Sequence, residues 1–314
     1  MKRVFSYLLI IVVIIALVYP PFMLSDYFLA LLFQIFTYVI LTISWWFFYS
    51  TKYVSLGSAA FVGLGAYITA IFCRPISVPL AIVLSGAITF IFASAIGLVT
   101  LRLRGVYFTI FTFGLSEFLS NAILWYENIY VGTIGRIVIS FDIRTLYYAQ
   151  IAFLLSSLLF IRLLLRSKIG LALKAIGESE DTAIHCGVNH VLYKSLGFAI
   201  SSMLMGIAGG LIAIRWSYIE PRIIINPLFS FQPTVMATLG GVSTFYGPIL
   251  GAIVLSTLSE YLALQFKEYY MIFFGSIIIV VIYLLPRGVL QFLPTRREKT
   301  KKLTHKELSY NLTM

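Results

Sequence analysis

Apolar runs long enough to cross a lipid bilayer recur along the whole chain, and charged residues are confined to the short breaks between them. Residues 7–18 and 272–285 carry no charged side chain, and crossing the hydrocarbon region takes about 20 consecutive, mostly apolar residues. Hydrophobic residues make up 60% of the 314 positions and charged residues 11%, against about 25% charged residues in soluble domains. With a mean hydropathy of +0.97, this chain must have the bilayer as its main solvent.

The charged and turn-forming residues divide the chain into ten apolar blocks, which we interpret as membrane spans. Their expected limits are about 4–24, 27–48, 53–73, 78–100, 105–125, 147–165, 195–214, 229–244, 248–266 and 270–286. The predicted fold is an all-α polytopic membrane protein, a bundle of about ten transmembrane helices that forms one domain over residues 1–294. The short connections leave no room for a separate soluble domain.

The first and the eighth blocks each admit a second interpretation. The first follows Lys2 and Arg3, as a signal peptide would, but no small-residue cleavage site follows it, which favours an uncleaved span. The eighth is short and contains Pro233, Gly240 and Gly241. It is therefore either a full span or a broken, re-entrant helix.

Basic residues are distributed unequally between the two sides of the predicted bundle. With the N-terminus inside and the sides alternating through ten spans, 17 of the 23 Lys and Arg residues fall on the cytoplasmic side and 6 outside. This bias is typical of membrane proteins, so the net charge of +11 does not indicate a nucleic-acid partner. We expect a multi-pass protein of the cell membrane with both termini cytoplasmic. Its tail, residues 295–314, is expected to be basic and disordered, and long outer loops are expected at 126–147 and 215–226.

Ionisable residues inside the predicted spans are few. The acids Asp26, Glu117 and Glu260 are scattered, whereas a proton- or sodium-coupled carrier needs a relay of such groups. A stand-alone secondary carrier of a small solute is therefore the alternative function. Glu117 is either a structural hydrogen-bond node or part of a solute path. The sequence shows no set of nucleophile and base, no metal-ligand spacing and no phosphate-binding loop, so we expect no catalysis, metal or cofactor in this chain.

A polar loop at about 167–193 interrupts the apolar pattern. Its residues 171–176 are expected to form a short helix, and a second one should begin where Glu178, Glu180 and Asp181 gather, because a helix N-terminus favours acids. Gly187 and Asn189 are expected to end that second helix. Such a helix on the cytoplasmic face can transmit a push from a soluble partner; the alternative is a solvated hairpin.

Small residues form clusters within the third, seventh and eighth spans. Small side chains allow helix backbones to approach closely, and glycine tolerates breaks in a helix where the backbone lines a cavity. We therefore expect Gly57, Ala60 and Gly63, with Gly240 and Gly241, to lie at a solute path. Tight helix packing is the alternative interpretation.

The polar loop resembles the cytoplasmic coupling loop of ABC importer permeases. Glu180, Ala183 and Gly187 match the Glu-Ala-Ala and Gly of that loop, with Thr182 in place of the first Ala. The wider chain resembles the branched-chain amino acid permease family. The matching segments follow the order of the family and lie at 55–67, 101–107, 193–194, 206–210, 239–241, 246–251 and 285–288.

The resemblance implies a transmembrane permease subunit of an ATP-driven importer. It implies coupling to the ATPase through Glu178, Glu180, Ala183 and Gly187. It also implies four partners: a second, homologous permease chain, two cytoplasmic ATPase subunits that bind the ATP, and an external solute-binding protein. The implied solute is a branched-chain amino acid or a related small polar solute such as urea or an amide. The outer loop at 131–136 departs from the family pattern and leaves the solute open.

Overall fold

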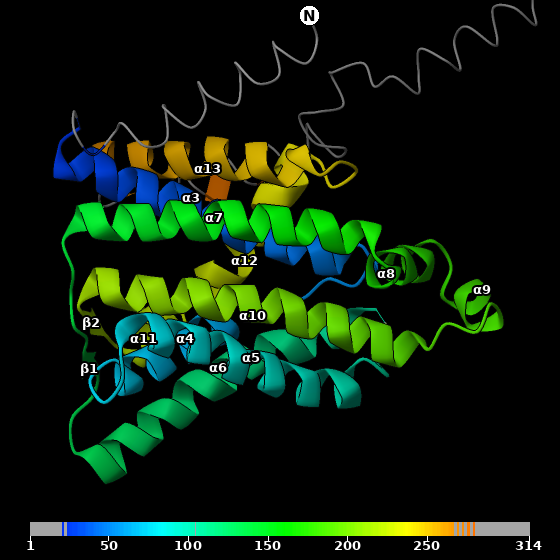
Figure 1. The fold of residues 1–314 in the computed structure, drawn as a ribbon, viewed down its shortest axis with the longest axis horizontal. Coiled ribbons are helices and arrows are strands. Elements are labelled where there is room, and N and C mark those ends of the chain that lie inside the picture. Colours follow the sequence, from blue (N-terminus) through cyan, green and yellow to red (C-terminus); the bar gives the residue numbers. More distant parts are fainter. Residues whose placement is uncertain are drawn as a thin grey trace, which may run out of the picture.

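The structure is a computed structural model that describes residues 24–103 and 105–266, with the isolated positions 21, 269, 272, 275, 276 and 279. Within these residues the chain is a bundle of long helices (Figure 1). The predicted first and last spans and the predicted tail lie outside the described residues.

Eight long apolar helices form this bundle, and each matches one of the predicted spans. They are α3 (Asp26–Tyr49), α4 (Ser58–Phe72), α5 (Val78–Thr100), α6 (Val106–Tyr126), α7 (Ile143–Arg166), α10 (His190–Trp216), α12 (Pro227–Gly240) and α13 (Tyr246–Gln265). Seven helical runs in the described part are long and apolar enough to cross a membrane, and α4 is a shorter apolar helix. The prediction of a helical, polytopic membrane protein is confirmed, with ten as an approximate number of spans.

Two predicted spans are shorter at one end than the sequence indicated. Residues 53–57 are not helical, so α4 begins at Ser58 instead of at 53. The eighth predicted span ends at Gly240 instead of at 244, because Gly241 takes a left-handed φ of +100° that a helix cannot continue. Helix α12 and the one-turn helix α11 (Pro221–Ile224) before it together form a run of 20 residues, Pro221–Gly240.

Helix α10 lies at the centre of the bundle, in contact with α3, α4 and α5 (Figure 1). Its small residues permit this close packing. A Cβ atom added at Gly209 would overlap the carbonyl oxygen of Val62, and one added at Gly206 would meet Thr89. The cluster at 206–210 therefore packs helices together, as small residues in membrane helices commonly do.

The two predicted outer loops meet at one end of the bundle. Strand β1 (Arg136–Ile137) pairs antiparallel with β2 (Tyr218–Ile219). The buried carboxylate of Glu127, the first residue of the π-helical turn η1 (Glu127–Val131), accepts hydrogen bonds from Gly135 N at 2.8 Å and from Arg136 Nε at 3.0 Å. The polar loop, with its helices α8 (Lys168–Glu178) and α9 (Glu180–His185), lies at the opposite end (Figure 1).

Candidate functional site: the polar loop between α7 and α10

The polar loop contains two helices, as predicted, but the break between them lies at Ser179. Helix α8 buries Ala172, Leu173 and Ile176 against the bundle. Ser179 is extended, with φ −161° and ψ 111°, and its hydroxyl accepts a hydrogen bond from Thr182 N at 3.3 Å. Serine at this position satisfies an amide that the first turn of α9 leaves unpaired.

Gly187 ends α9, as predicted, because it takes a left-handed φ of +82°. The following amide, Val188 N, donates to Ala183 O at 3.0 Å, which is the bond of a glycine-terminated helix. The prediction for Asn189 was wrong. Its side chain begins α10 instead, accepting a hydrogen bond from Leu192 N at 3.1 Å. Glu178 is likewise the last residue of α8, not part of the start of α9.

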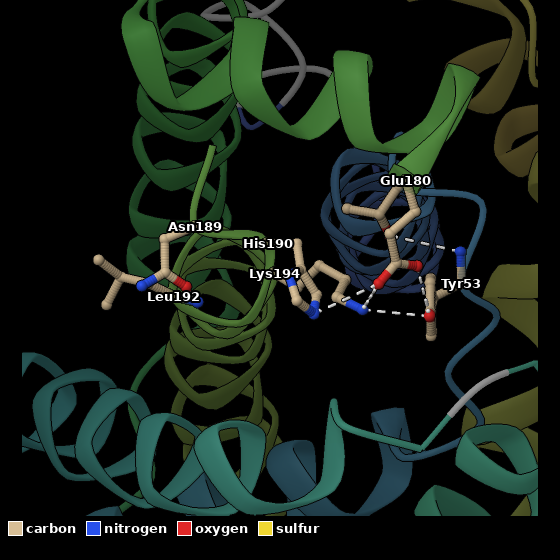
Figure 2. A network of polar contacts seen from close by, with 7 residues as sticks. Tyr53, Glu180, Asn189, His190, Leu192 and Lys194 are labelled. Carbon is tan, nitrogen blue, oxygen red and sulfur yellow. Dashed lines mark hydrogen bonds and ion pairs between the residues drawn. The ribbon is translucent and has the colours of Figure 1, made fainter. Parts of the chain in front are cut away.

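Glu180 connects α9 to two other parts of the chain (Figure 2). Its Oε1 accepts a hydrogen bond from Lys194 Nζ at 2.9 Å, and its Oε2 accepts one from the Tyr53 hydroxyl at 2.9 Å. Lys194 Nζ also donates to the Tyr53 oxygen at 3.1 Å and lies 4.3 Å from the centre of the Tyr53 ring. His190 Nε2 is 3.6 Å from the same carboxylate. We call Tyr53, Glu180, His190 and Lys194 the Glu180 network.

The Glu180 network is shielded from water on its Lys194 side. The Lys194 side chain is 1% exposed and that of Glu180 is 20% exposed. Burial alone would raise the pKa of Glu180. Hydrogen bonds from Lys194 and Tyr53 and the electrostatic effect of Lys194 and His190 outweigh burial, so the pKa lies below its ordinary value of 4.5. Glu180 is therefore ionised at neutral pH and neutralises a buried ammonium group.

Tyr53 extends the Glu180 network towards α6. Its ring packs edge-on against Phe108 in the first turn of α6, with 5.9 Å between the ring centres. Two hydrogen bonds join the non-helical segment 53–57 to α6. Thr109 Oγ1 donates to Val54 O at 2.8 Å, and Leu56 N donates to Thr112 Oγ1 at 3.0 Å. One short segment therefore contacts both the polar loop and a membrane-spanning helix.

A groove of about 420 Å³ lies beside α8. Its lining comes from α8, from the end of α3 and from the connection between α12 and α13, and includes Trp46, Lys52, Lys174, Glu178 and Phe245. Gly177 packs on the Ser50 carbonyl at this place, so α8 lies directly on the end of α3. Together with the exposed surface of α9, the groove gives this end of the bundle an irregular, charged surface.

The residues predicted for the solute path do not line a common space; the small ones lie in different contacts between segments of the chain. A Cβ atom at Gly63 would overlap Ile225, and one at Gly240 would overlap the backbone of Gly247. Ala60 is fully buried. Gly57 is not tightly enclosed, since a Cβ atom there would meet its nearest neighbours at 3.4 Å.

Of the predicted path residues, Glu117 is the one that lies at the surface. Its side chain is exposed on α6 and is not brought together with the glycines of α4 and α12.

Sequence reasoning missed both main partners of Glu180. Lys194 was counted among the basic residues and within a segment that resembles the permease family, and Tyr53 as the first residue of a span, but neither was expected to contact Glu180. Lys194 lies fourteen positions after Glu180 and Tyr53 lies 127 before it, so no helical spacing relates them. The available signal was a single Lys at the start of a long apolar helix, where a buried charge requires a partner.

Comparison with known proteins places the chain in a transporter family. The family model described as "Branched-chain amino acid transport system / permease component" matches residues 27–282. The permease protein LivM of Salmonella typhimurium, named for a high-affinity branched-chain amino acid transport system, is 27% identical over 75% of this chain and 63% of its own length. The chain thus spans less than two-thirds of that relative.

Other permease proteins of such systems are also similar. BraD of Pseudomonas aeruginosa is 27% identical over 68% of this chain and 76% of its own. LivH of Escherichia coli is 26% identical over 40% of each chain. No solved structure matches the chain. Because the family model covers the helical bundle and the polar loop together, this chain belongs to the family of permease components of branched-chain amino acid transport systems.

Proposed function

We propose that this chain is a transmembrane permease subunit of an ATP-driven ABC importer for branched-chain amino acids. The observation that carries the proposal is the Glu180 network, which fastens an exposed loop helix to the central helix of the bundle and to the segment before α4. A loop that only capped two spans would need no buried ion pair. The family membership and the names of the relatives support the solute class.

The proposed assembly contains partners that supply what this chain lacks. Two cytoplasmic ATPase subunits would bind and hydrolyse ATP, because the sequence has no phosphate-binding loop. They would dock on α9 and the groove beside α8. A second, homologous permease chain and an external solute-binding protein complete the importer. The polar loop then lies on the cytoplasmic side, where the basic residues of the chain are concentrated.

The contacts of the Glu180 network suggest how a push on α9 would reach the membrane. Movement of α9 pulls on Lys194 at the start of α10 and on Tyr53. Tyr53 in turn contacts Phe108, and the segment behind it is hydrogen-bonded to α6. ATP-driven closure of the ATPases would therefore shift α6 and α10 together, which is the coupled rigid-body motion expected of a switching transporter.

The arrangement of acids argues against a stand-alone secondary carrier. Glu127 is paired with Arg136, Glu260 accepts a hydrogen bond from Tyr27 at 3.3 Å, and Glu117 points outward from α6. Among the residues that the structure describes, these groups form no continuous relay across the bundle. Proton-coupled transport would need one.

Leucine uptake by the complete importer, reconstituted in vesicles, tests the proposal. Uptake should require ATP on the cytoplasmic face and should be unaffected by dissipating proton and sodium gradients. Lys194→Met should uncouple ATP hydrolysis from uptake, because it removes the charge that Glu180 holds. Lys168→Met, which changes an exposed lysine of α8 outside both the network and the groove, serves as the matched control. Uptake that persists without ATP and follows an ion gradient would refute the proposal.

A further inference from the structure

Helix α6 presents polar residues on the face that it turns away from the rest of the chain. Glu117, near the middle of this 21-residue helix, and Asn121, one turn later, are both exposed. Gly114 precedes them on the same face, and no described residue lies within 4 Å of where its side chain would start. The spacing of three and four residues places all three on one stripe of the helix.

This stripe differs in chemistry from the exposed face of the neighbouring span α5. The large exposed residues of α5 are all apolar, namely Leu80, Val83, Ile91, Leu98 and Val99. Such a face suits lipid. A carboxylate at mid-span does not, since charged groups in membrane helices almost always face a protein interior or a water-filled cavity. The outward face of α6 also exposes apolar residues such as Ile110, Phe118 and Trp125, so it is the strip around Glu117 that should face protein or water instead of hydrocarbon.

The outer end of the stripe opens into a polar cavity. Asn121 belongs to both, because it lies on the stripe and also lines a cavity of about 310 Å³. Asn128, Glu220 and Arg222 line the same cavity. Amide, carboxylate and guanidinium groups thus continue from the loops at the β1–β2 end of the bundle down to the middle of α6. A polar route of this kind is what a small zwitterion needs to leave water.

A second permease chain is the partner that best fits this face of α6. In Escherichia coli, two permease proteins, LivM and LivH, carry the name of the same transport system, and this chain is similar to both. A homologous chain would therefore share this membrane assembly. The open position at Gly114 would allow a helix of that chain to approach α6 closely.

We propose that the outward face of α6 forms one side of the solute path and that a second permease chain forms the other. In this arrangement Glu117 receives the ammonium group of the amino acid at mid-membrane, and the cavity lined by Asn128, Glu220 and Arg222 is the outer mouth. A carboxylate binds an ammonium group by strong, charge-assisted hydrogen bonds. Asn121 Nδ2 donates one hydrogen bond to Glu117 O at 2.8 Å, which leaves its second N–H to donate to the solute carboxylate. This inference rests on the proposed function and names the place and chemistry of its solute path.

Water access to engineered cysteines tests the position of the path without any transport measurement. In the complete importer with Cys73→Ala and Cys186→Ser, single cysteines are placed by Gly114→Cys and Asn121→Cys on α6, and by Ile91→Cys on α5. The probe is a water-soluble, positively charged methanethiosulfonate, which reacts with the thiolate that forms in water. We expect the α6 cysteines to react about tenfold faster or more than the α5 cysteine. Equal rates on the two helices would overturn the path.

The role of Glu117 is tested by transport kinetics. Glu117→Gln should lower kcat/KM for leucine uptake about 10- to 100-fold, as expected for loss of a charge-assisted hydrogen bond. Glu117→Asp should retain part of the activity, and ATP hydrolysis should persist in both variants. Glu260→Gln, which neutralises an acid of α13 that lies outside the stripe, is the matched control and should transport as the unmodified importer does.

The two proposals fail in different ways. Leucine uptake by Glu117→Gln at the unmodified rate would overturn the ammonium role. An unmodified importer that moves no leucine at all would refute the proposed function, whereas the labelling contrast between α6 and α5 would still decide where the water-accessible path lies.

Discussion

Neutralising Glu180 tests whether the polar loop is held by its ion pair. The variant Glu180→Gln keeps the size of the side chain and a hydrogen-bond acceptor for Tyr53, but it removes the charge that Lys194 Nζ contacts at 2.9 Å. Lys194 stays buried, with 1% of its side chain exposed. The change therefore leaves an ammonium group in the protein without a counter-charge.

The magnitude follows from burial. A hydrogen bond to a charged group contributes about 1.5–3 kcal/mol, and breaking a fully buried ion pair costs about 3–5 kcal/mol. Glu180 is 20% exposed, and the Tyr53 oxygen can still accept a hydrogen bond from Lys194, so we expect the lower range, about 1.5–3 kcal/mol. Because 1.4 kcal/mol corresponds to a factor of ten, the attachment of α9 should weaken about 10- to 100-fold.

Hydrogen exchange in lipid nanodiscs measures this effect directly. The amides of Ala183, Cys186 and Val188 are hydrogen-bonded within α9 and its terminal turn, and they should exchange about 10- to 100-fold faster in Glu180→Gln. The interior of α10 should not change. Asp181→Asn, which neutralises the exposed neighbouring acid, is the control. Unchanged exchange in Glu180→Gln, or an equal change in Asp181→Asn, would show that the ion pair does not hold α9.

Three further predictions follow from the same contacts. The Glu180 pKa is lowered in the folded protein. The stabilisation that the Glu180 carboxylate provides is therefore present above about pH 4.5 and is lost as the pH falls through the lower folded pKa. The difference in Tm between the unmodified protein and Glu180→Gln should shrink over that window, and a difference that grows on acidification would contradict this prediction. Gly187→Ala should destabilise the end of α9 by about 1 kcal/mol or more because φ is +82°, whereas Gly187→Asn should be milder in a thermal melt; equal effects would exclude backbone strain. Gly240→Ala should lower the Tm and the yield of folded protein, because the new Cβ would overlap the Gly247 backbone. Gly57→Ala, whose Cβ would meet its nearest neighbours at 3.4 Å, should be tolerated. A larger loss of Tm in Gly57→Ala than in Gly240→Ala would refute the assignment of Gly240 to helix packing.

Local patterns in the sequence predicted the helices well. Uninterrupted apolar runs specified α3, α5 and α13 to within a few residues, because a span must satisfy its backbone internally over a fixed thickness. The glycine at 187 likewise located the end of α9, whereas its start was expected too early, because Glu178 ends α8. These features are local, since the chemistry that begins or ends a helix lies within one turn of it.

Contacts between distant segments were not predictable in the same way. The pairing of Glu180 with Tyr53 joins residues 127 positions apart, and the β1–β2 pair joins two loops separated by four helices. The glycines illustrate the same difficulty. Gly63 and Gly240 differ little from Gly114 in sequence, yet the first two are enclosed by neighbouring segments and the third faces open space. Which glycine packs and which one leaves room depends on the positions of other helices.

These placements favour the proposed solute path at the edge of this chain over a path through its interior. A path lined by Gly63 and Gly240 would have to pass through contacts that leave no space for a Cβ atom. Glu117 is instead exposed near the middle of α6, whose first two turns are hydrogen-bonded to the segment that carries Tyr53. The loop helix that would receive the push and the helix that would border the solute are therefore connected through Tyr53 and Phe108. Tyr53→Leu should thus impair uptake even though the residue touches neither ATPase nor solute, and normal coupled uptake by that variant would remove the connection.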